Sequence, residues 1–317
     1  MRAAVLQRLG EPLELVDRSL PVPKGDEVLV RVLGAGVCRS DVHLSGGLYP
    51  DLPVPLILGH EIAGEAEGIG PVLVYGAWGC GSCALCARGE DQLCPDRRSV
   101  GWRSDGGFAE YVVVPHPRFL LPLDGLDPVR AAPLADAGVT PYRAVRRARE
   151  WLGPGESALV FGAGALGQFA IQYMELLTEA HVIAVDPVAA KRERARTLGA
   201  EETAAPEDEL PSARVVLDFV GTEETMSQAL CAVQLQGLYL LIGEAGGQVP
   251  IGFELIPGEA HFSTVRWGSI SDQRMVLDLA HSGKLDWLVE PLPLERANEA
   301  LGRLRQGDTM GRLVLVP

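Results

Sequence analysis

Short apolar runs alternate with helical patterns over residues 157–242. Residues 157–161 are a short apolar run, and apolar positions then recur at helical spacing as far as Leu177. The same alternation predicts strands over 182–185, 215–220 and 238–242, and helices over 189–198 and 226–235. Alternating strands and helices predict a doubly wound parallel sheet in an α/β domain.

One strand–helix unit of this pattern is shortened. Between Gly199 and Val215 there is no room for a normal strand and helix, and Pro206 and Pro211 interrupt the stretch. In the strand order 3-2-1-4-5-6, the third strand lies at an edge of the sheet. We therefore predict that this edge strand is missing, a loss that leaves the other strands paired.

A glycine-rich loop joins the first predicted strand to its helix. It contains Gly162, Gly164 and Gly167, with Ala165 and Leu166 between the last two. The spacing is typical of Rossmann dinucleotide-binding loops, in which glycines allow a pyrophosphate to approach a helix N-terminus. Asp186 ends the second strand and is predicted to bind the adenosine ribose, which favours NAD over NADP. The alternative is a plain strand–turn–helix in which Asp186 is a helix cap.

Four of the six cysteines lie in one short lobe, residues 79–95. Cys80, Cys83, Cys86 and Cys94 have the spacing Cys-x2-Cys-x2-Cys-x7-Cys, which predicts a structural zinc held by four thiolates. An iron–sulfur cluster is the alternative, because the ferredoxin run begins in the same way, but its last gap is shorter. Cys231 lies in a helical pattern and is predicted to be a buried core residue.

Polar residues follow two apolar strands in the first part of the chain. Cys-Arg-Ser-Asp-Val-His at 38–43 follows residues 28–33, and Gly-His-Glu at 59–61 follows residues 55–58. Cysteine, histidine and a carboxylate are the ligand types of an open catalytic zinc site. A lone cysteine or histidine is more often a core residue, and spacing alone does not bring Cys38 to His60.

Composition narrows the class of protein. The chain has 317 residues, a length typical of two domains, and 47% of them are apolar, which indicates a globular fold. Lysine and arginine number 28 against 42 aspartates and glutamates, a net charge of −14, which disfavours binding to nucleic acid or to anionic membranes. No apolar run is long enough to cross a bilayer and no signal-like segment is present, so we expect a soluble, cytoplasmic protein.

These motifs together resemble those of the zinc-dependent medium-chain alcohol dehydrogenases, and particularly the bacterial secondary-alcohol dehydrogenases. The resemblance runs nearly from end to end and includes Gly311-Arg312 near the C-terminus. It implies a mostly β, GroES-like catalytic domain over residues 1–136 and 270–317 that carries the cysteine lobe. A Rossmann NAD-binding domain over residues 137–269 is inserted in it.

The resemblance also assigns roles to single residues. It implies a catalytic zinc held by Cys38, His60 and Asp136, and hence two zincs per chain; the residues alone favour a helix N-cap at Asp136. Further implied roles are a second carboxylate beside the zinc at Glu61, orientation of the histidine by Asp41, a proton relay at Ser40 and His43, pairing with the coenzyme pyrophosphate at Arg39 and Arg312, and a substrate-pocket wall at Trp267.

The function implied by the resemblance is reversible oxidation of alcohols, with secondary alcohols preferred, to ketones or aldehydes by hydride transfer to NAD. A homodimer or homotetramer is implied as well. Two alternatives remain open: a polyol or formaldehyde dehydrogenase of the same family, and a nucleotide-binding relative without catalysis.

Overall fold

The chain forms two units, and the second is inserted into the first. The computed structural model describes all 317 residues. The outer unit comprises Met1–Val139, Gly268–Lys284 and Leu288–Pro317, and the inserted unit comprises Thr140–Trp267 and Leu285–Trp287. The short stretch Leu285–Trp287 groups with the inserted unit, whereas the family resemblance implied that it belongs to the catalytic domain.

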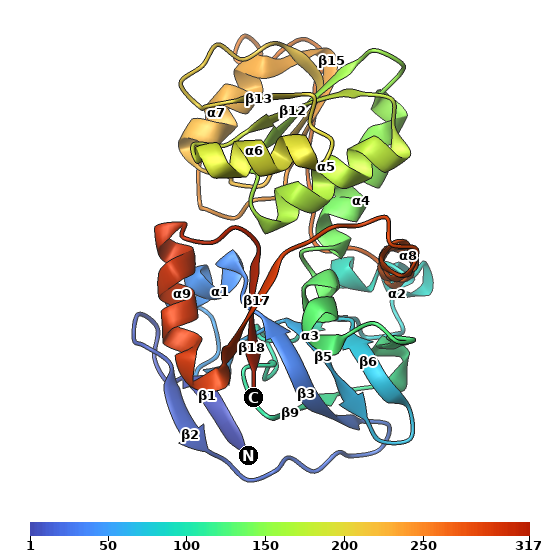
Figure 1. Cartoon of the computed structure of the whole chain (residues 1–317), viewed down its shortest axis with the longest axis vertical. Helices are drawn as coiled ribbons and strands as arrows, with labels where there is room; N and C mark the ends of the chain where they lie inside the picture. Colours follow the sequence, from blue (N-terminus) through green and yellow to red (C-terminus); the bar gives the residue numbers. More distant parts are fainter. The chain divides into compact units, whose positions relative to one another are not determined.

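A seven-stranded sheet forms the centre of the outer unit (Figure 1). Its order is β10-β6-β5-β3-β18-β17, with β9 paired to β3. Strand β3 pairs with β5, β9 and β18, always antiparallel, while β17 and β18 run parallel. The strands are β3 (Val28–Gly36), β5 (Glu61–Ala66), β6 (Gly70–Val74), β9 (Tyr111–Val114), β10 (Leu120–Pro122), β17 (Val289–Pro293) and β18 (Arg312–Val316).

Smaller elements complete the outer unit. Two small sheets have the orders β2-β1-β4 and β7-β8, and their strands are β1 (Arg2–Leu6), β2 (Glu14–Asp17), β4 (Leu56–Ile57), β7 (Ala77–Trp78) and β8 (Arg98–Ser99). The helices are α1 (Arg39–Ser45), α2 (Ala84–Ala87), α3 (Pro128–Ala131), α8 (Ile270–His281) and α9 (Ala297–Gln306). Short 3-10 turns are η1 (Asp91–Leu93), η2 (Pro117–Phe119), η3 (Ala132–Ala135) and η5 (Leu294–Arg296).

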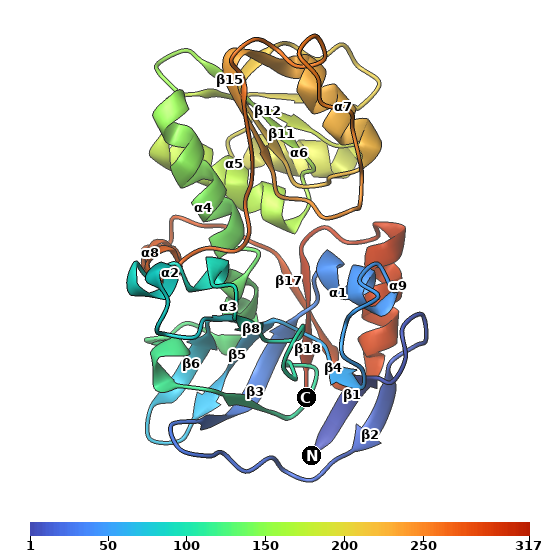
Figure 2. The same cartoon turned by 180° about the vertical axis from the view of Figure 1, so that it is seen from behind.

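The inserted unit contains a six-stranded, fully parallel sheet, which confirms the doubly wound fold. Its order is β13-β12-β11-β14-β15-β16. The strands are β11 (Ser157–Phe161), β12 (His181–Val185), β13 (Glu202–Ala204), β14 (Ala213–Asp218), β15 (Val233–Leu241) and β16 (His261–Thr264). The helices are α4 (Val139–Ala148), α5 (Ala165–Leu177), α6 (Ala189–Thr197) and α7 (Glu223–Ala232), with the 3-10 turn η4 (Arg149–Trp151). Helices α5 and α6 lie in front of the strands in Figure 1, and α7 lies nearer the viewer in Figure 2.

Three predictions for the inserted unit were wrong. The third strand is present as β13, a three-residue strand that pairs with β12 from Ile183↔Glu202 to Val185↔Ala204. The following residues carry no helix, so the shortened segment lacks its helix rather than its strand. Helix α7 ends at Ala232, because the chain already pairs as β15 from Val233. Cys231 is exposed and does not belong to the core.

The core of the inserted unit lies on its sheet. Leu159, Phe161, Ile183 and Val216 come from three neighbouring strands, and each is at most 4% exposed. Burial on this scale explains why the strands are almost continuously apolar in sequence. No helix of the chain is long and apolar enough to span a membrane, and the cytoplasmic location stays a prediction.

Candidate functional site: two metal clusters and a nucleotide-binding loop

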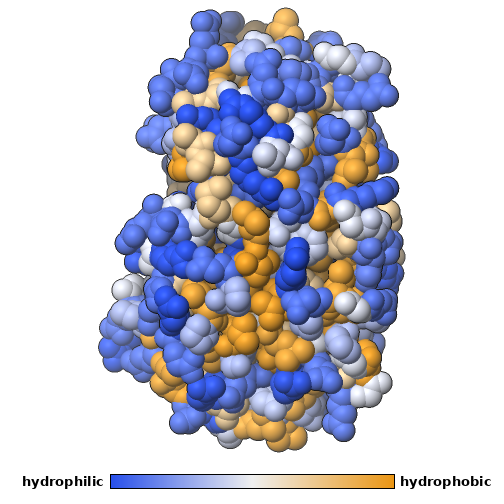
Figure 3. Space-filling model, viewed as in Figure 1, coloured by the Kyte–Doolittle hydropathy of each residue, from blue (hydrophilic) through white to orange (hydrophobic).

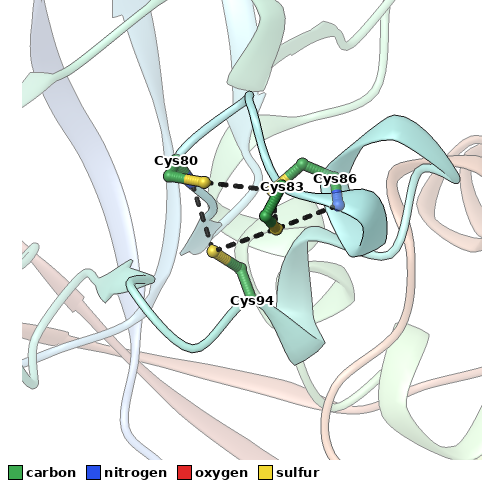
Figure 4. Close-up of side chains that lie close together, drawn as sticks. All are labelled: Cys80, Cys83, Cys86 and Cys94. Atoms are coloured by element: carbon green, nitrogen blue, oxygen red, sulfur yellow. Dashed lines mark hydrogen bonds between the residues drawn. The ribbon is translucent and has the colours of Figure 1, made fainter.

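The four cysteines of the lobe converge in space (Figure 4). The Sγ atoms of Cys83 and Cys86 are 3.5 Å apart, those of Cys83 and Cys94 are 3.8 Å apart, and those of Cys80 and Cys86 are 4.0 Å apart. A zinc tetrahedron with Zn–S bonds of about 2.3 Å has sulfur–sulfur edges of about 3.8 Å. An iron–sulfur cluster would hold its thiolates farther apart, because several atoms lie between them. The spacing therefore fits a single zinc ion.

Backbone hydrogen bonds and shifted pKa values at these thiols favour the binding of a cation. The amides of Cys86 and Cys80 donate to the Sγ atoms of Cys83 and Cys94 at 3.5 and 3.4 Å. The hydrogen bond with Ser82 lowers the pKa of the Cys80 thiol to about 6, whereas burial raises the pKa of the Cys86 thiol to about 12. A bound cation would replace the proton that burial keeps on Cys86.

Arg118 holds the cysteine lobe from outside it. Its Nη2 donates to the carbonyl of Gly79 at 3.0 Å and to Oδ1 of Asp91 at 2.8 Å. Asp91 is 1% exposed, and the arginine packs over the ring of Phe119. We did not expect this contact from the sequence, because the arginine and the aspartate are 27 positions apart and Arg118 lies outside the cysteine motif.

A second cluster brings together Cys38, His60, Glu61 and Asp136, whose ligand atoms lie within 4.8 Å of one another. Oδ2 of Asp136 is 3.6 Å from Sγ of Cys38 and 3.4 Å from Nε2 of His60. Cys38 precedes α1, His60 precedes β5, and Asp136 follows η3. The carboxylate of Asp136 points at the cluster, which disfavours the helix-cap interpretation of this residue.

Asp41 lies beside the histidine of this cluster. Its Oδ1 lies 3.4 Å from Nδ1 of His60, and its other oxygen accepts from the amide of Cys38 at 2.8 Å. Burial lowers the pKa of His60, but the charge of Asp41 and the hydrogen bonds of His60 with Asp136, Asp41 and Cys38 outweigh burial and raise the pKa well above its usual value. With Nδ1 directed at Asp41, Nε2 faces Cys38 and Asp136 and is placed to bind a metal.

Glu61, the fourth member of this cluster, forms a buried ion pair with Arg312. Nη2 of Arg312 is 2.6 Å from Oε1 of Glu61, and the two residues are at most 4% exposed. Oε2 of Glu61 has no hydrogen-bond partner, and a Cβ at Gly36 would lie 1.9 Å from it, so only glycine fits there. Burial raises the pKa of Glu61 to about 7 although the charge of Arg312 opposes it. Arg312 donates this hydrogen bond to Glu61, and its pairing with a coenzyme pyrophosphate stays a prediction.

The remaining predicted residues of this region lie on α1. Oγ of Ser40 is 3.8 Å from Sγ of Cys38, and His43 is half-buried one turn later. Burial and the charge of Arg39 lower the pKa of His43. Arg39 is exposed and donates to the carbonyl of Leu304. Trp267 is half-buried and has a φ of +51°, and its place in a substrate pocket stays a prediction.

The glycine loop of the inserted unit follows β11 and opens α5. Gly162 has a φ of +88°, and a Cβ on Gly167 would lie 1.8 Å from the Gly162 carbonyl oxygen. Gly167 therefore permits the close packing of α5 on the loop. A Cβ on Gly164, the N-cap of α5, would meet no atom within 4 Å. A phosphate-binding turn needs glycines for three such properties: a tight turn, room for the phosphate at the backbone, and close packing of the helix.

Asp186 is built into this loop. Its Oδ2 accepts from the amide of Ala163 at 2.9 Å, and its Oδ1 accepts from the amide of Val188 at 2.8 Å. The side chain therefore holds the loop against the end of β12. A carboxylate has about four lone-pair sites, so these two bonds leave capacity for ribose hydroxyls.

Comparison with known proteins agrees with this geometry. A family model described as alcohol dehydrogenase GroES-like domain matches residues 24–125, and one described as zinc-binding dehydrogenase matches residues 165–282. The NAD-dependent alcohol dehydrogenase of Sulfurisphaera tokodaii is 37% identical, and the match covers 100% of both chains. The D-arabinose 1-dehydrogenase (NADP(+)) of Saccharolobus solfataricus is 32% identical and covers 100% of this chain and 97% of its own.

A solved structure agrees as well. The alcohol dehydrogenase of Aeropyrum pernix superposes with a TM-score of 0.91 at 32% identity, and the match covers 100% of both chains. Relatives above 30% identity thus span the whole chain, and the two clusters of metal-ligand residues and the glycine loop are in place. The chain belongs to the zinc-dependent medium-chain alcohol dehydrogenase family.

Proposed function

We propose that the protein is a zinc- and NAD-dependent dehydrogenase that oxidises alcohols reversibly to ketones or aldehydes, with secondary alcohols preferred. The observation that carries this proposal is the convergence of Cys38, His60 and Asp136 within 4.8 Å. A cysteine, a histidine and a carboxylate leave one vertex of a zinc tetrahedron for the substrate. The cysteine lobe supplies all four of its ligands from protein, so it suits a second, structural zinc.

When bound, zinc supplies a Lewis acid for the substrate oxygen and NAD supplies the hydride acceptor. Asp41 keeps Nε2 of His60 directed at the cluster. Oγ of Ser40 lies 3.8 Å from Sγ of Cys38, where it would take the hydroxyl proton of an alcohol at this cluster and pass it through the coenzyme ribose to His43 on the same helix, and so to solvent. The lowered pKa of His43 keeps its imidazole neutral near pH 7 and able to accept that proton.

The proposed coenzyme is NAD, bound at the glycine loop. Gly164 leaves space for the pyrophosphate at the N-terminus of α5, where amides and the helix dipole favour an anion. The carboxylate of Asp186 would accept the ribose hydroxyls and repel a 2′-phosphate. Arg39 and Arg312 are proposed to pair with the pyrophosphate, and Trp267 to line the substrate pocket.

Metal analysis and activity test the proposal together. We expect two zincs per chain in protein purified without added metal. We expect Asp136→Ala to retain one zinc and to form no NADH from isopropanol. Asp51→Ala removes an exposed carboxylate of the same unit and serves as the control, which keeps both properties. A single zinc in the unmodified protein, or full activity in Asp136→Ala, would refute the assignment of the site.

Two alternatives are decided by substrate range. Faster oxidation of a pentose or a polyol than of isopropanol would favour a sugar or polyol dehydrogenase, the direction in which the D-arabinose 1-dehydrogenase relative points. Faster oxidation of formaldehyde would favour a formaldehyde dehydrogenase. NADH binding without turnover of any of these compounds would favour a relative that has lost catalysis.

We propose further that copies of the chain associate through the inserted unit. Strand β16 ends the sheet order, so its outer edge can pair with the same edge of a second copy about a two-fold axis. The preceding loop exposes Ile251 by 68%, Phe253 by 95% and Leu255 by 57%, which marks a contact surface. Apolar residues also gather on the outer unit in Figure 3 and are available for the further contact of a homotetramer.

Sedimentation measures this association directly. We expect Phe253→Asp to sediment as a smaller species than the unmodified chain. Val22→Asp is the matched control, because Val22 is 78% exposed in the outer unit and lies outside the proposed surface. An unmodified chain that sediments as a monomer at micromolar concentration would rule out the association.

A further inference from the structure

Tyr75, just beyond β6, reaches a distant part of the chain. Its hydroxyl donates a hydrogen bond to the carbonyl oxygen of Gly268 at 2.7 Å, across 193 positions, and lies at the longer distance of 3.4 Å from Oε1 of Gln92. Tyr75 is fully buried, and Gly268 is buried as well. A buried carbonyl that loses its donor is destabilised, because water does not replace the bond. The hydroxyl therefore ties the large sheet to the residue that leads into α8.

The tyrosine itself is held firmly. Its backbone amide donates to the carbonyl of Phe119 at 2.8 Å, and its carbonyl accepts from Nε1 of Trp78 at 2.7 Å. Its ring stacks on the ring of Phe119 with centroids 6.2 Å apart and planes at 16°. With the backbone and the ring fixed, the hydroxyl has a defined position and provides a rigid support for Gly268.

The backbone that it supports is strained. Trp267 has a φ of +51°, a left-handed conformation that a bulky side chain adopts only where its surroundings impose it. A Cβ on Gly268 would lie 2.5 Å from Cγ2 of Val139, so the chain passes there in close contact. Directly afterwards, Ser269 and Asp272 cap α8 with reciprocal hydrogen bonds. The hydroxyl of Tyr75 is one of the contacts that hold this conformation.

We propose that Tyr75 is a positioning residue for substrate selectivity, which acts through Gly268 on the orientation of the Trp267 indole. This inference rests on the proposed function and on the predicted place of Trp267 in the substrate pocket. Without the hydroxyl, the backbone at Gly268 relaxes and Trp267 loses its fixed direction. An aromatic alcohol that packs on the indole then binds less well, whereas a small alcohol that does not reach the indole is little affected.

Tyr75→Phe removes the hydroxyl alone. We expect its kcat/KM for α-methylbenzyl alcohol to fall by about tenfold, mainly through KM, and that for isopropanol to change by less than about twofold. The matched control is Tyr173→Phe, because that hydroxyl is equally buried and has no hydrogen-bond partner. In a Trp267→Ala background, Tyr75→Phe is expected to leave the ratio of the two kcat/KM values unchanged.

Each outcome decides the inference. An equal fall for both alcohols, or no change in their ratio, would show that Tyr75 has only a structural role. A shift that persists in the Trp267→Ala background would show that Trp267 is not the residue positioned. Gly268→Ala displaces the same backbone while it leaves Tyr75 intact, and it serves if Tyr75→Phe fails to fold. If the unmodified protein oxidises neither alcohol, the proposed function fails, which is distinct from failure of the inference.

Discussion

Two glycines of the loop after β11 should separate stability from coenzyme binding. Gly167→Ala would place a methyl group 1.8 Å from the Gly162 carbonyl oxygen, so α5 must move away from the loop. Overpacking of this kind costs about 1–3 kcal/mol of folding free energy. Gly164→Ala meets no atom within 4 Å and keeps an allowed φ of −73°, so its cost should stay below about 1 kcal/mol.

The expected shift in melting temperature follows from the size of the inserted unit. Residues 140–267 and 285–287 amount to about 130 residues, which unfold with an entropy of about 0.27 kcal/mol/K at about 2.1 cal/mol/K per residue. Gly167→Ala should therefore lower the Tm of this unit by about 4–11 °C in calorimetry. Gly164→Ala should change the Tm by less than about 4 °C.

Binding should rank the two variants differently. A methyl group at Gly164 would stand where the pyrophosphate is proposed to approach the backbone, so NADH should bind at least about tenfold more weakly. A fluorescence titration with NADH measures this affinity, and the unmodified chain is the reference. The reasoning is refuted if Gly167→Ala melts with the unmodified chain, or if Gly164→Ala binds NADH as tightly as that chain does.

Three further results are expected. Asp186→Arg should shift coenzyme preference toward NADP, and it should also lower the Tm, since its carboxylate holds the loop through two backbone amides; unchanged discrimination would contradict the ribose assignment. Arg118→Met should speed zinc release to a chelator from the cysteine lobe, while zinc at the other cluster remains. The hydrogen bond with Arg303 lowers the pKa of Glu290, so this pair stabilises the fold above the unfolded pKa and is lost as pH falls; the Tm of Glu290→Gln should therefore fall less than that of the unmodified chain between pH 6 and pH 3.

In the inserted unit, the apolar pattern predicted the central strands better than the edge strand. Its central strands are apolar throughout and its helices alternate regularly, so the parallel sheet was predictable. Strand β13 was missed because its three residues are at most partly buried and include no apolar run. Its pairing with β12 depends on backbone hydrogen bonds, which have no sequence signature.

The end of α7 was missed for a related reason. Apolar residues continue at helical spacing past Ala232, but the chain pairs as a strand from Val233 and bulges at Gln236, whose φ is +57°. Tertiary pairing overrides helical periodicity here. The last helical turn exposes Cys231, which explains why a core position was the wrong expectation for it.

The sequence indicated which residue types could bind the metal, but it did not show that these residues lie close together in the fold. Cys38 and Asp136 are 98 positions apart, and only family resemblance separated the ligand interpretation of Asp136 from a helix cap. No sequence motif predicted the hydrogen bond between Tyr75 and Gly268. The bond from Tyr75 to Gly268 spans 193 positions and ends on a backbone carbonyl, an acceptor that every residue possesses.

The two clusters differ in how much of the chain each must close. Cys80 and Cys94 are separated by 14 positions, against 98 for Cys38 and Asp136. Loop-closure entropy makes the longer loop costlier by about 2 kcal/mol in an unfolded chain. A nascent polypeptide can therefore bind an ion in the cysteine lobe before the large sheet has formed. The cluster of Cys38 and Asp136 can bind its ion only after the chain has folded. The cysteine lobe should therefore bind its zinc first during biosynthesis. Zinc starvation should leave folded chains that lack only the zinc of the Cys38 and Asp136 cluster.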